Sequence, residues 1–490
     1  MSIETPRRSF PIRILGLPLR GFFLCTLIGT LLSACSAQQP PVSTPADAVD
    51  NTVDSSVGSS ADETREIPSE SETEPSTEQG SDQDTSQDTE WFDRLLEREV
   101  GERPPLTSFA ATDGTFEAAA QAKLQGTIEN AEGNYSISLD VGAEEPVTCI
   151  LFAQDQDMAS ALAVSSKENF ALIESSFESL ESKTLLDTSA GATEGGISFM
   201  TVDWIYTVKA EGETQAGHIK HALARLPNRG LYCGHNEVGY KKTFQQTFQE
   251  LADSFVWRDP APQPYLKEIF LLYLAERPIG LVQEAYLRDG DGDTRSESLT
   301  SMMIPVSDSE LQVSDSYSIQ FSTPDGRLIN AIEAEAQGDQ LVTNLSLIPQ
   351  EDDTWLVQGL YQGKDLEENL GEEDLRSSLG QLLDLQDFLP DAAVGDTLET
   401  AEWLPGADPT QFSVTTIELL EPLESGYKVK IDAGLLMEAE VDAKGNLRLM
   451  SATMGHLSFR GERIYQHGSL SGHRAQPASE PSPEAPLETP

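Results

Sequence analysis

The chain has 490 residues, and its 82 acidic side chains far outnumber its 32 lysines and arginines, giving a formal net charge of −50. A surface this acidic repels phosphate backbones and anionic lipid headgroups, so the composition argues against nucleic acid as a partner. Beyond residue 35 the longest uninterrupted apolar run, residues 269–275, is too short to span a bilayer.

The N-terminus has the organisation of an export signal. Four arginines precede an apolar run at residues 21–32, and the tetrad Leu-Ser-Ala-Cys occupies residues 32–35. This order of basic, apolar and small residues is typical of signal peptides, and the run is shorter than the roughly twenty residues of a transmembrane helix. The tetrad resembles the lipobox of bacterial lipoproteins, whose cysteine is diacylated before signal peptidase II cuts in front of it. The resemblance implies that residues 1–34 are a signal peptide and that Cys35 carries the lipid anchor.

The residue after this cysteine bears on location. In lipoproteins of this class an aspartate there favours retention in the inner membrane, and here the residue is Ser36. The resemblance therefore implies attachment to the bacterial outer membrane, on the periplasmic side. A diacyl group, such as palmitate chains, together with an N-terminal acyl chain exceeds the two-chain minimum for lasting attachment.

Residues 35–106 are predicted to be a disordered acidic tether. Between residues 36 and 90 there are fourteen acidic side chains, one basic side chain and no aromatic residue. Such a segment cannot bury enough apolar surface to offset the entropy lost on ordering. The apolar residues within 91–100 share one helical face, which predicts a short helix there. We expect it to pack on its own domain, although a partner protein is an alternative.

Residues 107–258 are predicted to form an α/β sandwich domain with an antiparallel sheet. Along the segment the spacing of apolar residues alternates between two residues, as in a strand, and three to four residues, as in a helix. It predicts strands at 135–141, 147–152, 200–208, 217–226 and 230–233, and helices at 157–180 and 244–255. This order, with Tyr-Lys-Lys-Thr-Phe at 240–244 and Leu-Ala-Asp-Ser-Phe at 251–255, resembles PsbP-like domains. The resemblance implies a binding and assembly domain, in which a final helix packs across the sheet.

Residues 262–468 are predicted to form a β-rich domain with one helix, which makes the fold class α+β. Three prolines at residues 260–264 mark the boundary. Alternating apolar residues predict strands at 268–275, 279–288, 294–304, 311–321, 328–334, 341–347, 355–361, 411–419, 427–431, 435–441 and 447–453, and a helix at 375–388. The meander resembles half-barrels of envelope lipoproteins, which curve around a helix and sometimes shelter an acyl chain. A packed core without ligand space is the alternative. The proline-rich tail, 469–490, is predicted to be disordered.

The cysteines predict one disulfide. Cys25 lies in the signal peptide and Cys35 is assigned to the lipid, which leaves Cys149 and Cys233, each in a strand-like stretch. In an oxidising compartment two such cysteines form a disulfide most simply. Closing a loop of 84 residues stabilises the fold by roughly 4 to 5 kcal/mol on the chain-entropy estimate.

Two groups of residues suggest metal binding. In the first, Asp289, Asp291 and Asp293 alternate as the ligands of a calcium loop do. An EF-hand, however, needs Gly at its sixth position and Glu at its twelfth, and here these positions hold Thr294 and Thr300. An acidic hairpin turn without calcium is the alternative that explains the same residues.

The second group is a cluster of histidines, His218, His221 and His235, near Cys233. Imidazole and thiolate are zinc ligands. His218 and His221 are three residues apart, so on a strand they face opposite sides, and Cys233 is assigned to the disulfide. We therefore favour ordinary surface or core histidines over a zinc site.

No catalytic signature stands out. Ser166-Lys167 and His456 lack the spacing of a nucleophilic site, and Glu372-Glu373 is typical of a solvated helix face. The sequence therefore predicts a non-enzymatic membrane-anchored lipoprotein without a cofactor, which binds an apolar ligand or an envelope protein. The alternative is a hydrolase or metal-dependent enzyme whose site is assembled from scattered residues.

Overall fold

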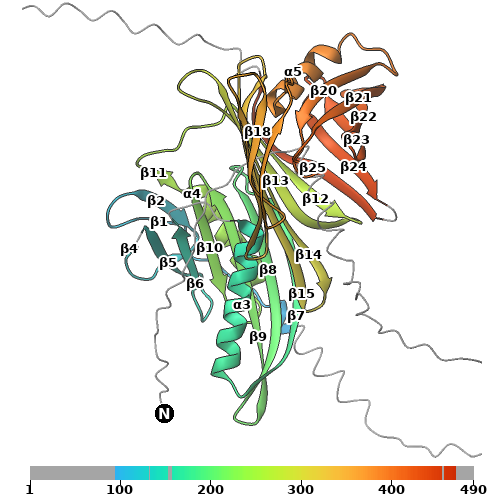
Figure 1. Cartoon of the computed structure of the whole chain (residues 1–490). Coiled ribbons are helices and arrows are strands. Elements are labelled where there is room, and N and C mark those ends of the chain that lie inside the picture. Colours follow the sequence, from blue (N-terminus) through green and yellow to red (C-terminus); the bar gives the residue numbers. More distant parts are fainter. Residues whose placement is uncertain (1–93, 132, 153–156, 455–456, 471–490) are drawn as a thin grey trace, which may run out of the picture.

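The structure, a computed structural model, describes residues 94–131, 133–152, 157–454 and 457–470 (Figure 1). The predicted signal peptide, Cys35, most of the predicted tether and nearly all of the predicted C-terminal tail lie outside these ranges. The described chain forms two folded regions that pack against each other, and their named strands pair antiparallel, as predicted. Within these ranges no helix combines the length and the hydropathy needed to cross a membrane.

The first domain is built on an eight-stranded sheet in the order β3-β5-β6-β10-β9-β8-β7, with β4 paired to β5. A small sheet in the order β1-β2-β11 adjoins it. The strands are β1 (Thr107–Ala110), β2 (Phe116–Ala120), β3 (Lys123–Leu124), β4 (Asn130–Ala131), β5 (Asn134–Asp140), β6 (Val147–Phe152), β7 (Ser179–Ala192), β8 (Ser198–Ala210), β9 (Glu213–Leu226), β10 (Arg229–His235) and β11 (Val256–Trp257).

Helices cover both faces of this sheet. They are α3 (Met158–Ser176) and α4 (Lys241–Ser254). Neighbouring residues of a strand point to opposite faces, so Asp203 of β8 meets Lys241 of α4, while Trp204 packs edge-on against Phe170 of α3. Because both faces are covered, β8 is buried at seven consecutive positions, 198–204.

The prediction of a helix at 157–180 was wrong at its C-terminal end. Helix α3 is continuous and ends at Ser176, and Leu180 already belongs to β7. Phe177, the C-cap residue, has an extended backbone, so the chain leaves the helix there and begins the strand two residues later. The apolar spacing alone did not show this change, because Phe177 and Leu180 also fit the helical period.

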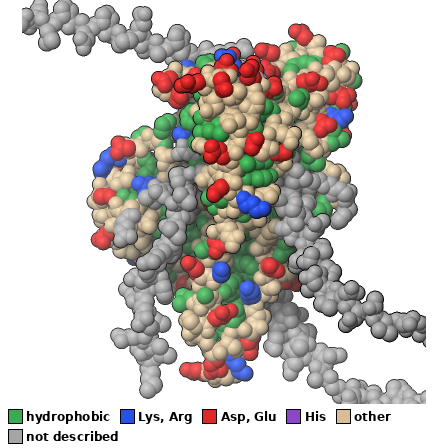
Figure 2. Space-filling view, in the orientation of Figure 1, with side chains coloured by type: hydrophobic (Ala, Val, Ile, Leu, Met, Phe, Trp, Pro, Cys, Tyr) green, Lys and Arg blue, Asp and Glu red, His purple; other side chains and the backbone are tan. Residues whose placement is uncertain are grey.

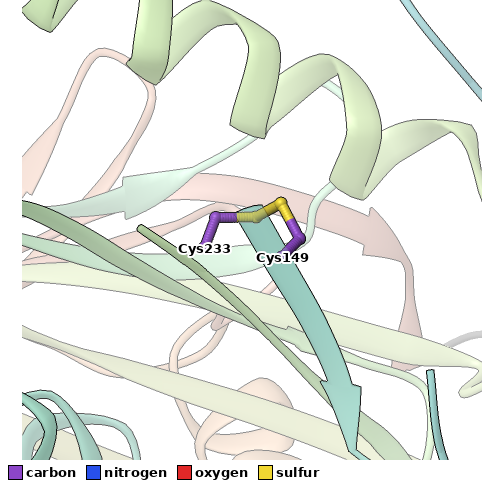
Figure 3. Close-up of a disulfide and its surroundings, with 2 residues drawn as sticks. All are labelled: Cys149 and Cys233. Carbon is purple, nitrogen blue, oxygen red and sulfur yellow. A yellow bond between two sulfur atoms is a disulfide. The ribbon is translucent and has the colours of Figure 1, made fainter. Parts of the chain in front are cut away.

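Helix α4 packs over the disulfide and is held by residues 94–103, which are ordered although they lie within the range predicted as a disordered tether. Its apolar stripe joins the core that contains Cys149 and Cys233 (Figure 3). Residues 94–96 are helical, and the segment after them lies along α4. The Lys242 and Thr243 N–H groups donate to the Glu99 carboxylate over 2.7 and 2.9 Å, and the Arg103 guanidinium makes a two-pronged pair with Glu250.

The second domain is one 14-stranded antiparallel sheet in the order β19-β18-β17-β16-β15-β14-β13-β12-β25-β24-β23-β22-β21-β20. Consecutive hairpins generate both halves, and β25 joins them by pairing with β12. The strands are β12 (Leu266–Leu274), β13 (Arg277–Arg288), β14 (Thr294–Ser307), β15 (Glu310–Ser322), β16 (Leu328–Gln337), β17 (Gln340–Pro349), β18 (Trp355–Tyr361), β19 (Lys364–Leu370), β20 (Thr397–Trp403), β21 (Phe412–Leu423), β22 (Gly426–Asp432), β23 (Leu436–Asp442), β24 (Leu447–Met454) and β25 (Leu457–Gly468).

This sheet curves around helix α5 (Ser378–Phe388). Trp355 of β18 and Trp403 of β20, which lie near opposite edges of the sheet, share one core cluster. The helix contacts β14, β15 and β20, and the Arg376 N–H just before it donates to the Ala401 carbonyl over 2.9 Å. The predicted meander with one enclosed helix therefore describes this domain, with β19, β20 and β25 as additional strands.

The interior of the curved sheet is packed on its apolar side. A cavity lined by Leu272, Met302, Met437, Met450 and Phe459 has a volume of only about 10 Å³. This is less than a ligand pocket needs. The space for an acyl chain that the half-barrel resemblance implied is therefore not found at this position.

Candidate functional site

The two domains share a continuous apolar core. Leu162 and Phe170 of α3 and Trp204 of β8 belong to the same cluster as Met303 of β14 and Val313 of β15. Apolar burial of this kind is the main force that holds domains together. The relative position of α3 and the β14–β15 hairpin is therefore set by packing.

A carboxylate of the second domain caps helix α3. The N-cap residue of α3 makes no side-chain capping bond. Instead, the N–H groups of Ala159 and Ser160 donate to Asp315 of β15, over 3.1 and 2.7 Å. The Ser301 hydroxyl also donates to this carboxylate, and Asp315 is only 3% exposed. A negative charge is favourable at a helix N-terminus, so this contact fixes the helix to the second domain.

Beside this contact, a groove of about 420 Å³ lies between α3 and the β14–β15 hairpin. Apart from Ser166, its buried lining is apolar and comes from both domains. The lining residues of this kind are Leu162, Phe170, Val202, Trp204, Met303 and Val313. Figure 2 shows apolar side chains between charged ones on this part of the molecule, whereas acidic side chains gather at the top. The volume falls within the range of small-molecule sites.

One polar group of this lining is buried without a partner. Trp204 is 5% exposed, and its indole Nε1–H has no hydrogen-bond partner among the described residues. Leaving a buried donor unpaired costs about 1 to 3 kcal/mol. Because the nitrogen itself is enclosed, a ligand in the groove does not reach it in this conformation.

The mouth of the groove carries four exposed charged side chains, Lys167 and Glu174 of α3, Lys183 of β7 and Glu310 of β15. The ammonium nitrogen of Lys183 lies 5.4 Å from the centroid of the Phe170 ring. An apolar floor with a few polar groups at its margin is typical of binding sites for small molecules.

Two of the three histidines considered for zinc, His218 and His235, belong to a separate, closed cluster under α4. His218, Lys220 and His235 are 1%, 0% and 2% exposed. The Lys220 ammonium donates to the Glu237 carbonyl over 2.5 Å and lies 3.4 Å from His218 Nδ1. His221 lies on the opposite face, where its Nε2 is 3.0 Å from the Asn169 amide nitrogen. The strand geometry thus separates His218 from His221, as predicted.

Burial governs the charges in this cluster. Burial lowers the pKa of Lys220 to about 8, although the Asp203 and Glu237 carboxylates raise it in part. Burial and the nearby Lys220 ammonium lower the pKa of His218 to about 3 and that of His235 to about 4. The histidines are therefore neutral at neutral pH. Because these side chains are almost fully enclosed, a substrate cannot reach them in this conformation.

A second buried set of titratable groups lies inside the curved sheet, where Glu268 and Glu284 face each other on β12 and β13. Arg463 Nη1 lies 2.7 Å from Glu268 Oε1. Burial raises the pKa of Glu268 to about 7 and places that of Glu284 well above its usual value. Both side chains are at most 4% exposed, so they too are enclosed. This pair could not be predicted from the sequence, because each glutamate lies in a strand whose other inward residues are apolar.

The acidic triplet is the turn of the β13–β14 hairpin. The Asp289 carboxylate accepts from the N–H groups of Asp291 and Asp293, each over 3.0 Å. These bonds account for Asp289 as a turn residue. Among the residues that the structure describes, no three His, Cys, Asp or Glu side chains are arranged to hold a metal ion. The calcium hypothesis has no further support from the geometry.

The remaining residues singled out in the sequence contribute to the fold, line the groove or lie outside the described ranges. Cys149 and Cys233 are opposite each other on β6 and β10 and form a disulfide (Figure 3). Ser166 is buried, and its hydroxyl donates to the Leu162 carbonyl. Lys167 is exposed at the groove, and Cys35 and His456 lie outside the described residues. The groove itself was not predicted, since its residues come from segments more than one hundred positions apart and form no motif.

Comparison with known proteins adds a distant structural likeness. No protein-family model matches the chain, and no curated protein matches it. Among solved structures, the chain is similar to a beta-barrel-like protein of the domain of unknown function DUF1849 from Brucella abortus. The alignment covers 42% of this chain and 98% of that chain, with 14% identity and a TM-score of 0.33. A likeness at this level does not indicate a function.

Proposed function

We propose that the protein is a lipoprotein of the bacterial outer membrane, anchored through Cys35 on the periplasmic side, and that it binds an apolar ligand without catalysing a reaction. The observation that carries the binding role is the groove between α3 and the β14–β15 hairpin. The tetrad that ends at Cys35 supports the anchor.

The lining of the groove favours an apolar ligand. Transfer of apolar surface from water contributes about 25 cal/mol per Å², and the buried lining side chains, among them Phe170, Met303 and Val313, offer such a surface. Both domains contribute walls, and Asp315 holds the walls together, so the groove does not depend on a mobile segment.

The position of the titratable groups favours binding over catalysis. A catalytic acid or base must come within hydrogen-bond reach of its substrate. The two clusters with the largest pKa shifts, around Lys220 and Glu284, are enclosed. At the groove the charged side chains are exposed and belong to the rim. This arrangement supports a carrier or sensor of an apolar molecule.

Native mass spectrometry of the full chain purified from membranes tests the binding role. The wild-type protein should retain a small apolar molecule. Ala171→Trp fills the groove from an exposed position of α3 and should abolish this retention. Val164→Trp adds the same ring to an exposed site of α3 outside the groove and should leave the retention unchanged. A wild-type protein that carries only a metal ion, only a protein partner, or nothing would refute the proposal.

Metabolic labelling with an alkynyl palmitate tests the anchor. The wild-type chain should incorporate the label and fractionate with the outer membrane. Cys35→Ala should abolish the labelling, because the thiol that forms the thioether is absent. Incorporation that persists in this variant, or a soluble unmodified wild-type product, would contradict the assignment.

A further inference from the structure

The two lysines at the groove are placed to meet a ligand at the end of the apolar floor. Lys167 precedes Phe170 by three residues on α3, so the two side chains lie on neighbouring positions of one helical face. Lys183 approaches the same ring from β7, with its ammonium nitrogen 5.4 Å from the ring centroid. Within the described ranges, neither ammonium group has a carboxylate within 4 Å. Both positive charges are therefore free to bind an anion.

The mouth of the groove also carries two glutamates, whose negative charges oppose the binding of an anion. Glu174 and Glu310 also line the groove, and they too have no ion-pair partner in the described part of the chain. The lysines differ from them because Lys183 lies directly over the Phe170 ring, which belongs to the buried floor. A ligand whose tail contacts Phe170 therefore meets an ammonium group first.

The net negative charge of the whole protein makes the two lysines at the mouth selective for an anionic ligand. With a net charge of −50, most of the surface repels an anion and attracts a cation. A cationic ligand would have many competing sites on this protein. An anionic ligand gains a favourable interaction only where lysines or arginines lack carboxylate partners, as at this mouth.

We infer that the ligand is an amphiphile with an apolar tail and an anionic head, such as a fatty acid or an anionic lipid. The tail lies on Phe170 and Met303, and Lys167 and Lys183 bind the head. This inference rests on the proposed binding function and specifies the class of ligand.

The test uses the full chain in lipid nanodiscs with two photoreactive probes, a long-chain fatty acid and its neutral methyl ester. Both probes carry the tail and a carbonyl oxygen, and only the acid carries the charge. Cross-linked peptides are quantified by mass spectrometry. We expect both probes to label α3 and the β14–β15 hairpin, and we expect the acid to label them more strongly.

The double variant Lys167→Gln, Lys183→Gln should lower the labelling by the acid about fivefold, since an exposed ion pair contributes up to about 1 kcal/mol. It should leave the labelling by the ester unchanged. Glu174→Gln should raise the labelling by the acid, because a like charge is removed. Lys209→Gln, an exposed lysine of β8 outside the groove, is the matched control and should change neither probe.

Three results would overturn the inference. If both probes label the groove equally and the double lysine variant alters neither, the groove binds apolar molecules but does not recognise an anionic head. If the lysine variant increases labelling by the acid, or Glu174→Gln decreases it, the head group is cationic. If neither probe labels α3 or the hairpin in the wild-type protein, the proposed binding function itself fails.

Discussion

Replacing Asp315 should weaken the attachment of helix α3 to the second domain. The carboxylate of Asp315 accepts hydrogen bonds from two N–H groups of α3, at Ala159 and Ser160, and from the Ser301 hydroxyl. All of these residues are at least nine-tenths buried, so water does not replace the lost bonds easily.

The size of the effect follows from these contacts. Loss of an N-cap bond costs about 0.5 to 2 kcal/mol, and loss of the negative charge near the helix end costs about 0.3 to 2 kcal/mol. Asp315→Asn keeps one acceptor oxygen and should cost about 2 kcal/mol. Asp315→Ala leaves several buried donors unpaired and should cost about 4 kcal/mol. Both losses are large compared with a typical stability of about 5 to 15 kcal/mol.

Urea unfolding and amide hydrogen exchange together measure this effect. In Asp315→Asn the exchange protection at Ala159 and Ser160 should fall, and cross-linking of the apolar probe in the groove should fall with it. Asp308→Asn changes an exposed aspartate in the loop between β14 and β15 and is the control. Glu99→Gln removes the carboxylate charge that caps α4 and should lower the exchange protection of that helix only. Unchanged protection at α3 in Asp315→Asn would refute the reasoning.

Two further predictions concern buried residues of the first domain. Burial lowers the pKa of His221 from 6.5 to about 3, so the folded state binds fewer protons than the unfolded state, and His221 lowers stability as the pH falls below about 6.5. His221→Gln should therefore show a shallower loss of urea stability between about pH 6.5 and about pH 4. Replacing Cys149 and Cys233 by alanine opens a loop of 84 residues and should cost about 4 kcal/mol by the same assay.

The strands with a clear inward and outward face could be predicted from the sequence. In β16, β17 and β18 buried residues alternate with more exposed ones over much of each strand, so the period of two is visible. Strand β7 was missed because it is an edge strand with few buried positions and a composition rich in Ser, Thr, Glu and Lys. Strand β25 was missed because an inward position holds Arg463, whose charge is paired with Glu268 on β12. A pairing partner almost two hundred residues away leaves no local pattern.

The candidate site was less predictable than the fold. A groove between domains depends on how two surfaces meet, and that contact is fixed by Asp315 and a shared apolar core, neither of which has a sequence signature. The residue patterns that stand out in the sequence have structural roles. The acidic triplet at Asp289 makes a hairpin turn, and the histidine cluster is divided between the two faces of a sheet. Side chains that look suited to metal binding in the sequence are thus used for folding.

The two remote helix caps lie on opposite faces of the first sheet. Glu99, near the end of the predicted tether, caps α4 on one face, whereas Asp315 caps α3 on the other face. Asp315 also lies on β15, two residues beyond Val313 of the groove, so it holds both walls at once. Tension from the proposed anchor at Cys35 would therefore act on α4 first. The width of the groove depends on the contact between α3 and β15, which such tension would reach only through the central sheet.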